Sequence, residues 1–187
     1  CEDNEIAEYK AEQLNLENTH RHEVEEKIDK DIAETEKKFN VIFAAEQREA
    51  IKAALTNGVS ISIITGGPGT GKTMIQKAII EIYRKNNYDK DIKCCAPTGR
   101  AARRMTESTG FDASTIHKAL NLFADDSGNY SEPELLDADF VIVDEVSMLD
   151  IHIAGMLFDA LKHNCQIVLI GDSEQLRRLV REQCFRK

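Results

Sequence analysis

The stretch Gly66–Thr73 has the residue types and spacing of a phosphate-binding loop, because it fits the pattern G-x-x-x-x-G-K-[ST]. Glycines allow positive φ values, so successive backbone N–H groups can point at an anion held at the start of the following helix. Lys72 would then hold the β- and γ-phosphates, and the Thr73 hydroxyl would ligate Mg²⁺. The alternative is a glycine turn that binds nothing. The predicted nucleotide contacts in this loop are Gly67, Pro68, Gly69, Thr70, Gly71, Lys72 and Thr73.

Two acidic residues, Asp144 and Glu145, end a continuous apolar run that starts at Phe140. Such a run predicts a buried central strand of a parallel sheet. If its carboxyl end faces the phosphate loop, Asp144 would hold Mg²⁺ directly or through water, and Glu145 would position or deprotonate an attacking water. The alternative is that the two acids cap the next helix.

Two glutamines could add contacts to a bound nucleotide. Gln47 lies near the start of a predicted helix, and its amide can donate and accept at once, which suits an adenine edge. Gln175 follows a second apolar strand that ends at Asp172. An uncharged amide there could distinguish ATP from ADP through a hydrogen bond near the γ-phosphate.

The elements that must position these residues alternate between strands and helices. Apolar and β-branched runs predict the strands, at residues 61–64, 92–97, 140–144 and 165–172. Apolar residues at helical spacing and capping residues predict the helices, around residues 50–55, from residue 72, from residue 98 and over Thr115–Leu120, with a loop at 123–133. This alternation predicts a parallel α/β domain, in which ligands gather at the carboxyl ends of the strands.

Three arginines, Arg100, Arg103 and Arg104, form a compact basic group just after the predicted strand that ends near Pro97. At the carboxyl end of a strand such a group could contact a ligand, and a solvated basic helix face is the alternative. His117 lies in the short helix, where a lone histidine is more often structural or solvated than functional.

Residues 1–38 hold 13 acidic and 6 basic residues, which accounts for most of the net charge of −9. Apolar residues at roughly helical spacing predict two helices, broken near residues 15–20, that form a solvated arm with one thin apolar stripe. The remaining chain is nearly neutral. Overall charge therefore does not indicate nucleic-acid binding, although a local patch could still provide it.

The 187 residues suffice for one α/β domain with a substantial core. No apolar run reaches the roughly 18 residues of a membrane span, and the acidic N-terminus is not typical of a signal peptide. The five cysteines show neither C-x-x-C nor zinc-site spacing. This usage favours reduced thiols in a cytosolic protein.

Together, these motifs resemble those of superfamily 1 DNA helicases of the RecD/TraA type. The resemblance covers about residues 40–176, and generic P-loop ATPases lack the combination. The matching segments are Gln47 (Q-motif), GGPGTGKT at 66–73 (motif I), APTGRAARRM at 96–105 (motif Ia), TIHKAL at 115–120 (usually written TIHRLL), DEVSM at 144–148 (motif II) and GDSEQL at 171–176 (motif III).

The resemblance implies a RecA-like P-loop fold, a parallel sheet flanked by helices, with Mg-ATP hydrolysis and movement along single-stranded DNA. It gives catalytic roles to Lys72, Asp144, Glu145 and Gln175. Motif Ia and the TIH segment would face DNA, which suggests as DNA-side residues Pro97, Thr98, Arg100, Thr115 and His117. Arginine contacts to phosphates need only a small basic patch, so the negative net charge does not exclude them.

The predicted organisation is an acidic helical segment at 1–38, a motor domain at 39–176 and a basic tail at 177–187. A complete motor of this type has a second RecA-like domain that supplies an arginine finger, worth about 10³–10⁵ in rate in related GTPases. We therefore expect this chain alone to be weak or inactive as a helicase. The alternatives are a nucleotide-binding fragment without catalysis and an unrelated P-loop kinase or ATPase, against which the other motifs argue.

The tail RRLVREQCFRK departs from the family, which continues motif III with Pro-Ser-Val-Gly. One interpretation is a basic helix at the end of a divergent domain. We favour a frameshift, because codons can be chosen for the tail so that one extra base after Leu176 restores Pro-Ser-Val-Gly and a further glycine. Resequencing across codon 176 tests this hypothesis. Stop codons soon after it in the new frame would contradict the frameshift.

Overall fold

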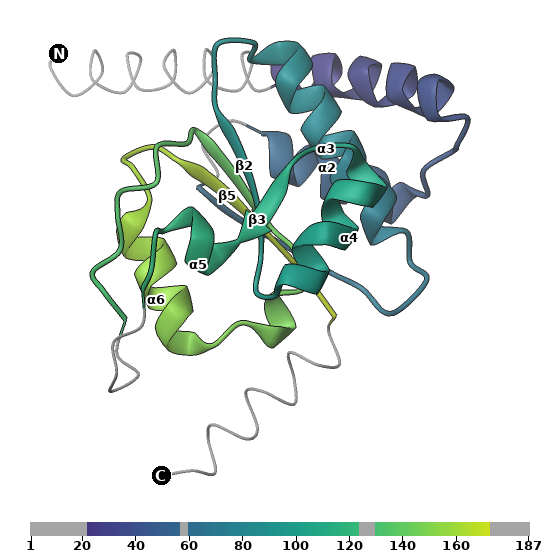
Figure 1. Ribbon diagram of the computed structural model, residues 1–187. Helices are drawn as coiled ribbons and strands as arrows, with labels where there is room; N and C mark the ends of the chain where they lie inside the picture. Colours follow the sequence, from purple (N-terminus) through teal and green to yellow (C-terminus); the bar gives the residue numbers. More distant parts are fainter. Residues whose placement is uncertain (1–21, 57–59, 124–129, 173–187) are drawn as a thin grey trace, which may run out of the picture.

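The computed structural model describes residues 22–56, 60–123 and 130–172 (Figure 1). Five strands form one parallel sheet in the order β1-β5-β4-β2-β3. Their bounds are β1 Ile61–Thr65, β2 Ile92–Ala96, β3 Ala113–Thr115, β4 Phe140–Val143 and β5 Gln166–Gly171. The predicted parallel α/β fold is confirmed.

Helices cover both faces of the sheet (Figure 1). On one face lie a helix over residues 22–39, α2 (Ala45–Leu55), α3 (Lys72–Asn86) and α4 (Gly99–Thr109). On the other lie α5 (Ile116–Ala119) and α6 (Ile151–Ala160), with the 3-10 turn η1 (Val146–Met148) just before α6. Parallel strands need such crossover helices, which bury the sheet on both sides.

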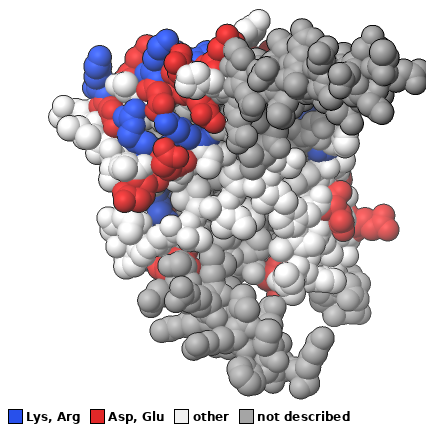
Figure 2. Space-filling view, turned by 180° about the vertical axis from the view of Figure 1, so that it is seen from behind, with Lys and Arg blue, Asp and Glu red and all other residues white. Residues whose placement is uncertain are grey.

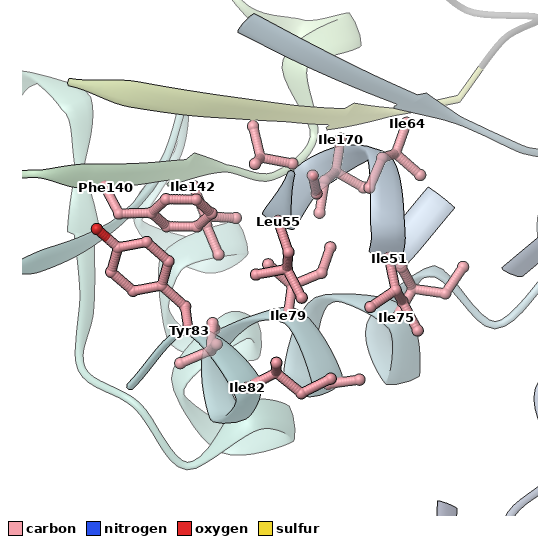
Figure 3. Close-up of a cluster of buried hydrophobic side chains, with 14 of the residues drawn as sticks. Ile51, Leu55, Ile64, Ile75, Ile79, Ile82, Tyr83, Phe140, Ile142 and Ile170 are labelled. Carbon is pink, nitrogen blue, oxygen red and sulfur yellow. The ribbon is translucent and has the colours of Figure 1, made fainter. Parts of the chain in front are cut away.

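The central strand β4 is buried along its whole length, as its continuous apolar run predicts. Phe140 and Ile142 point to the cluster under α2 and α3, whereas Val141 points to α5 and α6. Figure 3 shows the first cluster, in which the rings of Tyr83 and Phe140 stack with centroids 4.1 Å apart. Fully burying one large apolar side chain is worth about 1.5–3 kcal/mol, so these contacts hold α3 firmly against the sheet.

Residues 22–39 are helical, as predicted, but the interpretation of a solvated arm is wrong for this part. Ile28 and Ile32 are buried in the same core cluster as Ile79 of α3. Lys85 of α3 also pairs with Asp31, with 2.6 Å between nitrogen and oxygen. Charged side chains of both signs gather at this corner of the molecule, whereas the middle of that face is largely uncharged (Figure 2). The division of the chain at residue 38 stays a prediction. Described residues before and after this position share one hydrophobic core.

The sequence did not indicate β3. This strand has only three residues, Ala113–Thr115, and pairs with β2 alone at the edge of the sheet. A segment so short shows no alternation, and its pairing partner decides its conformation.

The predicted helix break near 15–20 and the tail 177–187 lie outside the described residues. Within the described residues, no helix is long and apolar enough to cross a membrane.

Candidate nucleotide-binding site

The sheet places the predicted site at the carboxyl ends of its strands. All five strands are parallel, so their carboxyl ends lie on the same side. The loop after β1 and the acids after β4 are separated by β5 alone, since β5 pairs with both strands. The sheet therefore brings together the loop and Asp144, which are about 70 residues apart in the sequence.

Glycine is required at several points of the loop. Gly69 and Gly71 have φ values of 78° and 82°, in the left-handed region that other residues rarely adopt. A Cβ on Gly66 would lie 2.6 Å from the Thr70 hydroxyl oxygen. The loop is thus folded back on itself by its glycines, and Gly71 starts α3 as its N-cap residue. Pro68, Gly69 and Thr70 form an exposed crest.

The Lys72 side chain lies across the loop. Its ammonium nitrogen donates to the carbonyl oxygens of Gly66 and Gly67 at 2.6 and 2.8 Å. The charge is therefore held where the loop would cradle a phosphate. Thr73 follows in the first turn of α3 and is exposed, so its hydroxyl is accessible to a ligand.

Gln47 touches the loop directly. Its amide oxygen accepts from the Ala44 N–H at 2.9 Å, and its amide nitrogen donates to the Thr70 carbonyl at 2.9 Å. The side chain thus caps α2 and ties that helix to the crest of the loop. A Cβ on Gly71 would lie 2.7 Å from this nitrogen, so the contact also depends on glycine at 71.

Asp144 is half-buried beyond the end of β4. Burial raises the pKa of its carboxyl group, while a hydrogen bond from the Glu145 N–H and the nearby Lys72 and Gln76 side chains act in the opposite direction. The Glu145 N–H donates to Asp144 Oδ1 at 2.8 Å. The 3-10 turn η1, which follows, has no side-chain cap, so the alternative role of the acids as helix caps finds no support here.

Glu145 has a φ of 53°, which is uncommon for a residue other than glycine. Such strain persists only where the surroundings enforce it. A carboxylate oxygen of Glu145 lies 3.7 Å from Nη1 of Arg104, on α4. The basic helix and the acidic strand end are thus in contact, a link that sequence reasoning did not find.

The predicted DNA-side residues lie at the carboxyl ends of the neighbouring strands β2 and β3, where Ala96 pairs with Thr115. Thr98 and Thr115 are N-cap residues whose hydroxyls accept from the backbone of α4 and α5. Pro97 is partly buried, and Arg100 is exposed in the first turn of α4. The His117 ring nitrogen Nε2 is 3.2 Å from the Tyr130 hydroxyl. The structure therefore brings these five residues together at the carboxyl ends of β2 and β3.

Sequence reasoning missed Gln76, which is 1% exposed and lies one helical turn after Lys72. It is polar within the buried, otherwise apolar face of α3, and this break in the pattern could have drawn attention to it. Gln175, predicted near the γ-phosphate, lies outside the described residues.

Residues 47–180 match a family described as AAA domain. The chain is 37% identical over 119 residues to the ATP-dependent RecD2 DNA helicase of Deinococcus radiodurans, covering 64% of this chain and 16% of that protein. It is 33% identical over 177 residues to the RecBCD enzyme subunit RecD of Haemophilus influenzae, covering 82% of this chain and 27% of that protein. The chain thus spans about a sixth to about a quarter of the length of these relatives.

Solved structures show a similar fold. A double mutant of Pif1 helicase from Bacteroides superposes with a TM-score of 0.52 at 20% identity, over 76% of this chain and 36% of the other. Pif1 helicase from Candida albicans gives a TM-score of 0.52 at 24% identity, over 71% of this chain and 33% of the other. Since the family match extends over most of the chain and its motifs meet at one sheet edge, the chain belongs to the AAA domain family, as a RecA-like motor domain of the RecD-like superfamily 1 helicase type.

Proposed function

We propose that this domain binds Mg-ATP at the loop Gly66–Thr73 and that, in the intact protein, ATP hydrolysis drives movement along single-stranded DNA. The observation that supports this most is the position of Lys72. Its ammonium group already lies inside the loop, bonded to two loop carbonyls, and near enough to Asp144 to stabilise that carboxylate. The chain's similarity to the ATP-dependent RecD2 DNA helicase and to the RecBCD enzyme subunit RecD supports the second half of the proposal.

On binding, Lys72 would exchange the carbonyl oxygens of Gly66 and Gly67 for phosphate oxygens. The carbonyl oxygens are neutral, whereas phosphate oxygens carry negative charge, so Coulomb attraction to the ammonium group favours this exchange. The residues fit the cation as well, because the Thr73 hydroxyl is accessible and the Asp144 carboxylate follows β4, which β5 alone separates from β1. Bound Mg²⁺ would supply charge neutralisation at the phosphates. Glu145 would orient the attacking water and accept its proton.

The proposal keeps the adenine contact for Gln47. Its amide oxygen and one N–H already bind the chain, which leaves one N–H and one lone pair of the oxygen available. The same side chain holds the loop crest at Thr70, so adenine binding at Gln47 would also act on the phosphate-binding loop. Gln175 stays a prediction near the γ-phosphate.

The DNA side is proposed at the carboxyl ends of β2 and β3. Arg100 supplies an exposed positive charge, and Thr98, Thr115 and His117 lie on the adjoining turns. Such contacts to the DNA backbone would depend on salt rather than on sequence.

Substitution of Lys72 by Ala tests the nucleotide site. We expect Lys72→Ala to weaken ATPγS binding by at least about 10-fold in calorimetry, since a charge-assisted hydrogen bond is worth about 1.5–3 kcal/mol. Lys93→Ala removes an exposed lysine of β2 and serves as the matched control, with unchanged affinity. Equal affinities for the Lys72→Ala variant and the unaltered chain would reject the site.

A further inference from the structure

Gln76 is the one buried side chain in the described residues with a nitrogen that has no hydrogen-bond partner. The residue is 1% exposed, and its amide nitrogen Nε2 makes no hydrogen bond with the described residues. Leaving a buried donor unpaired costs about 1–3 kcal/mol, which an apolar side chain of the same shape would avoid. A buried polar group that persists at such a cost indicates that its hydrogen bond is needed in some state of the protein.

The groups around Gln76 include one suitable hydrogen-bond acceptor. Gln76 lies four residues after Lys72 on α3, so both side chains lie on the same side of the helix. Its neighbours Ile75 and Ile79 are buried in the core and offer no polar atom. The polar group that it approaches is the Asp144 carboxylate, whose charged form it stabilises. The contact nevertheless falls short of a well-formed hydrogen bond, because Nε2 has no partner in hydrogen-bonding geometry.

The Asp144 carboxylate has a hydrogen bond to the backbone of the chain. One oxygen, Oδ1, accepts from the Glu145 N–H at 2.8 Å. A carboxylate offers about four lone-pair sites, so the group can accept a further hydrogen bond and still face a cation.

We propose that Gln76 is a positioning residue of the nucleotide site, whose amide N–H closes onto the Asp144 carboxylate when the Mg²⁺-nucleotide complex is bound and thereby holds that carboxylate toward the cation. This inference rests on the proposed role of Asp144 in metal binding. Partners that orient a metal-binding carboxylate change metal affinity typically 10- to 100-fold when they are removed. Gln76 thus acts through Asp144 and does not touch the nucleotide.

The test compares ATPγS binding by calorimetry in EDTA and in saturating Mg²⁺, using the full 187-residue chain. Gln76→Met keeps the size of the side chain and removes the donor. We expect it to lower the Mg²⁺-dependent gain in affinity about 10-fold, to leave the affinity in EDTA within about two-fold, and to leave the Tm unchanged or higher. A residue that only packs would leave the Mg²⁺-dependent gain unchanged.

Gln76→Asn is the second variant, and it keeps the polar group but shortens its reach by one methylene. It should show the same selective loss of the Mg²⁺-dependent gain, and it serves alone if Gln76→Met does not fold. An unchanged gain in the folded variant overturns the inference, as does an equal loss of affinity with and without Mg²⁺.

Two further variants separate failure of this inference from failure of the proposed function. Asp144→Asn must reduce the Mg²⁺-dependent gain if Asp144 serves the cation, and Lys72→Ala must weaken binding under both conditions. If these two behave as expected and the Gln76 variants do not, only the positioning role fails. If Asp144→Asn leaves the gain unchanged, the metal assignment fails, and the Gln76 inference fails with it.

Discussion

At the scale of single residues, Gly71 joins the phosphate-binding loop to α3 with a φ of 82°. Alanine in that conformation costs about 1–2 kcal/mol, and its Cβ would also lie 2.7 Å from the Gln47 amide nitrogen. We therefore expect Gly71→Ala to lower the free energy of unfolding by at least about 1 kcal/mol and to weaken ATPγS binding. Urea denaturation and calorimetry measure the two effects.

Gly155→Ala is the control for this substitution. Gly155 lies inside α6 with an ordinary φ, and apart from its chain neighbours and the nearby backbone of α6, no heavy atom lies within 4 Å of an added Cβ. Alanine there should stabilise the chain by about 0.5–1 kcal/mol through helix propensity. Similar changes at the two positions would contradict the geometry found for the loop.

The thiols of Cys94 and Cys95 provide a pH-dependent test of the core. Burial raises the pKa of Cys94 from 9.0 to about 12 and that of Cys95 to about 11. Above pH 9 the unfolded chain releases these protons while the folded chain keeps them. The free energy of unfolding should therefore fall as pH rises from about 9 to 11, by about 1.4 kcal/mol per pH unit for each thiol.

Cys94→Ala isolates this contribution. The variant lacks one of the two thiols, so its stability deficit relative to the unaltered chain should shrink as pH rises above 9. Urea denaturation at pH 8, 9 and 10 measures that difference and cancels the titration of other groups. A deficit that stays constant over this range would show that the Cys94 thiol is not shielded as the structure describes.

At the scale of elements, the helix over residues 22–39 behaves as part of the core. Ile32 is 0% exposed in the cluster that includes Ile51 and Ile79, and Arg48 of α2 bonds Glu36 at 2.8 Å. We expect Ile32→Ala to lower the free energy of unfolding by about 2–5 kcal/mol, because it removes buried methyl groups and leaves a cavity. Thermal or urea denaturation measures this loss.

Ile42→Ala is the matched control, because Ile42 is 93% exposed in the segment that leads to α2. Its substitution should change stability by less than about 0.5 kcal/mol. If Ile32→Ala were equally mild, the helix would not be docked on the domain.

At the scale of the whole molecule, we expect the isolated chain to hydrolyse ATP slowly and not to unwind DNA. The chain spans 16% and 27% of the RecD2 and RecD relatives, and the resemblance to the helicase family implies a second RecA-like domain that supplies an arginine finger. In related GTPases such an arginine contributes about 10³–10⁵ in rate. Steady-state phosphate release with and without single-stranded DNA measures the activity.

Two outcomes would change this expectation. Robust DNA-stimulated hydrolysis by a verified monomer would mean that a residue of this chain supplies the missing charge. Nucleotide binding with no turnover in either condition would favour the alternative of a binding fragment without catalysis.

Local patterns in the sequence determined the loop, the alternation of strands and helices, and the placement of Asp144 at a strand end. Each of these depends on a few adjacent residues, such as the glycines of Gly66–Thr73 or the apolar run after Phe140. Motif order then indicated the helicase family, which the comparisons confirmed.

Only the tertiary structure decided how distant segments meet. The position of β5 between β1 and β4, the docking of residues 22–39, and the contact of Gln47 with Thr70 join residues far apart in the sequence. The short strand β3 likewise has no local signature, and the break that Gln76 makes in the apolar face of α3 does not show that its amide nitrogen is unpaired. Pairing, burial and hydrogen-bond partners follow from the folded arrangement of all elements, because periodicity shows which face of an element is apolar but not which element covers it.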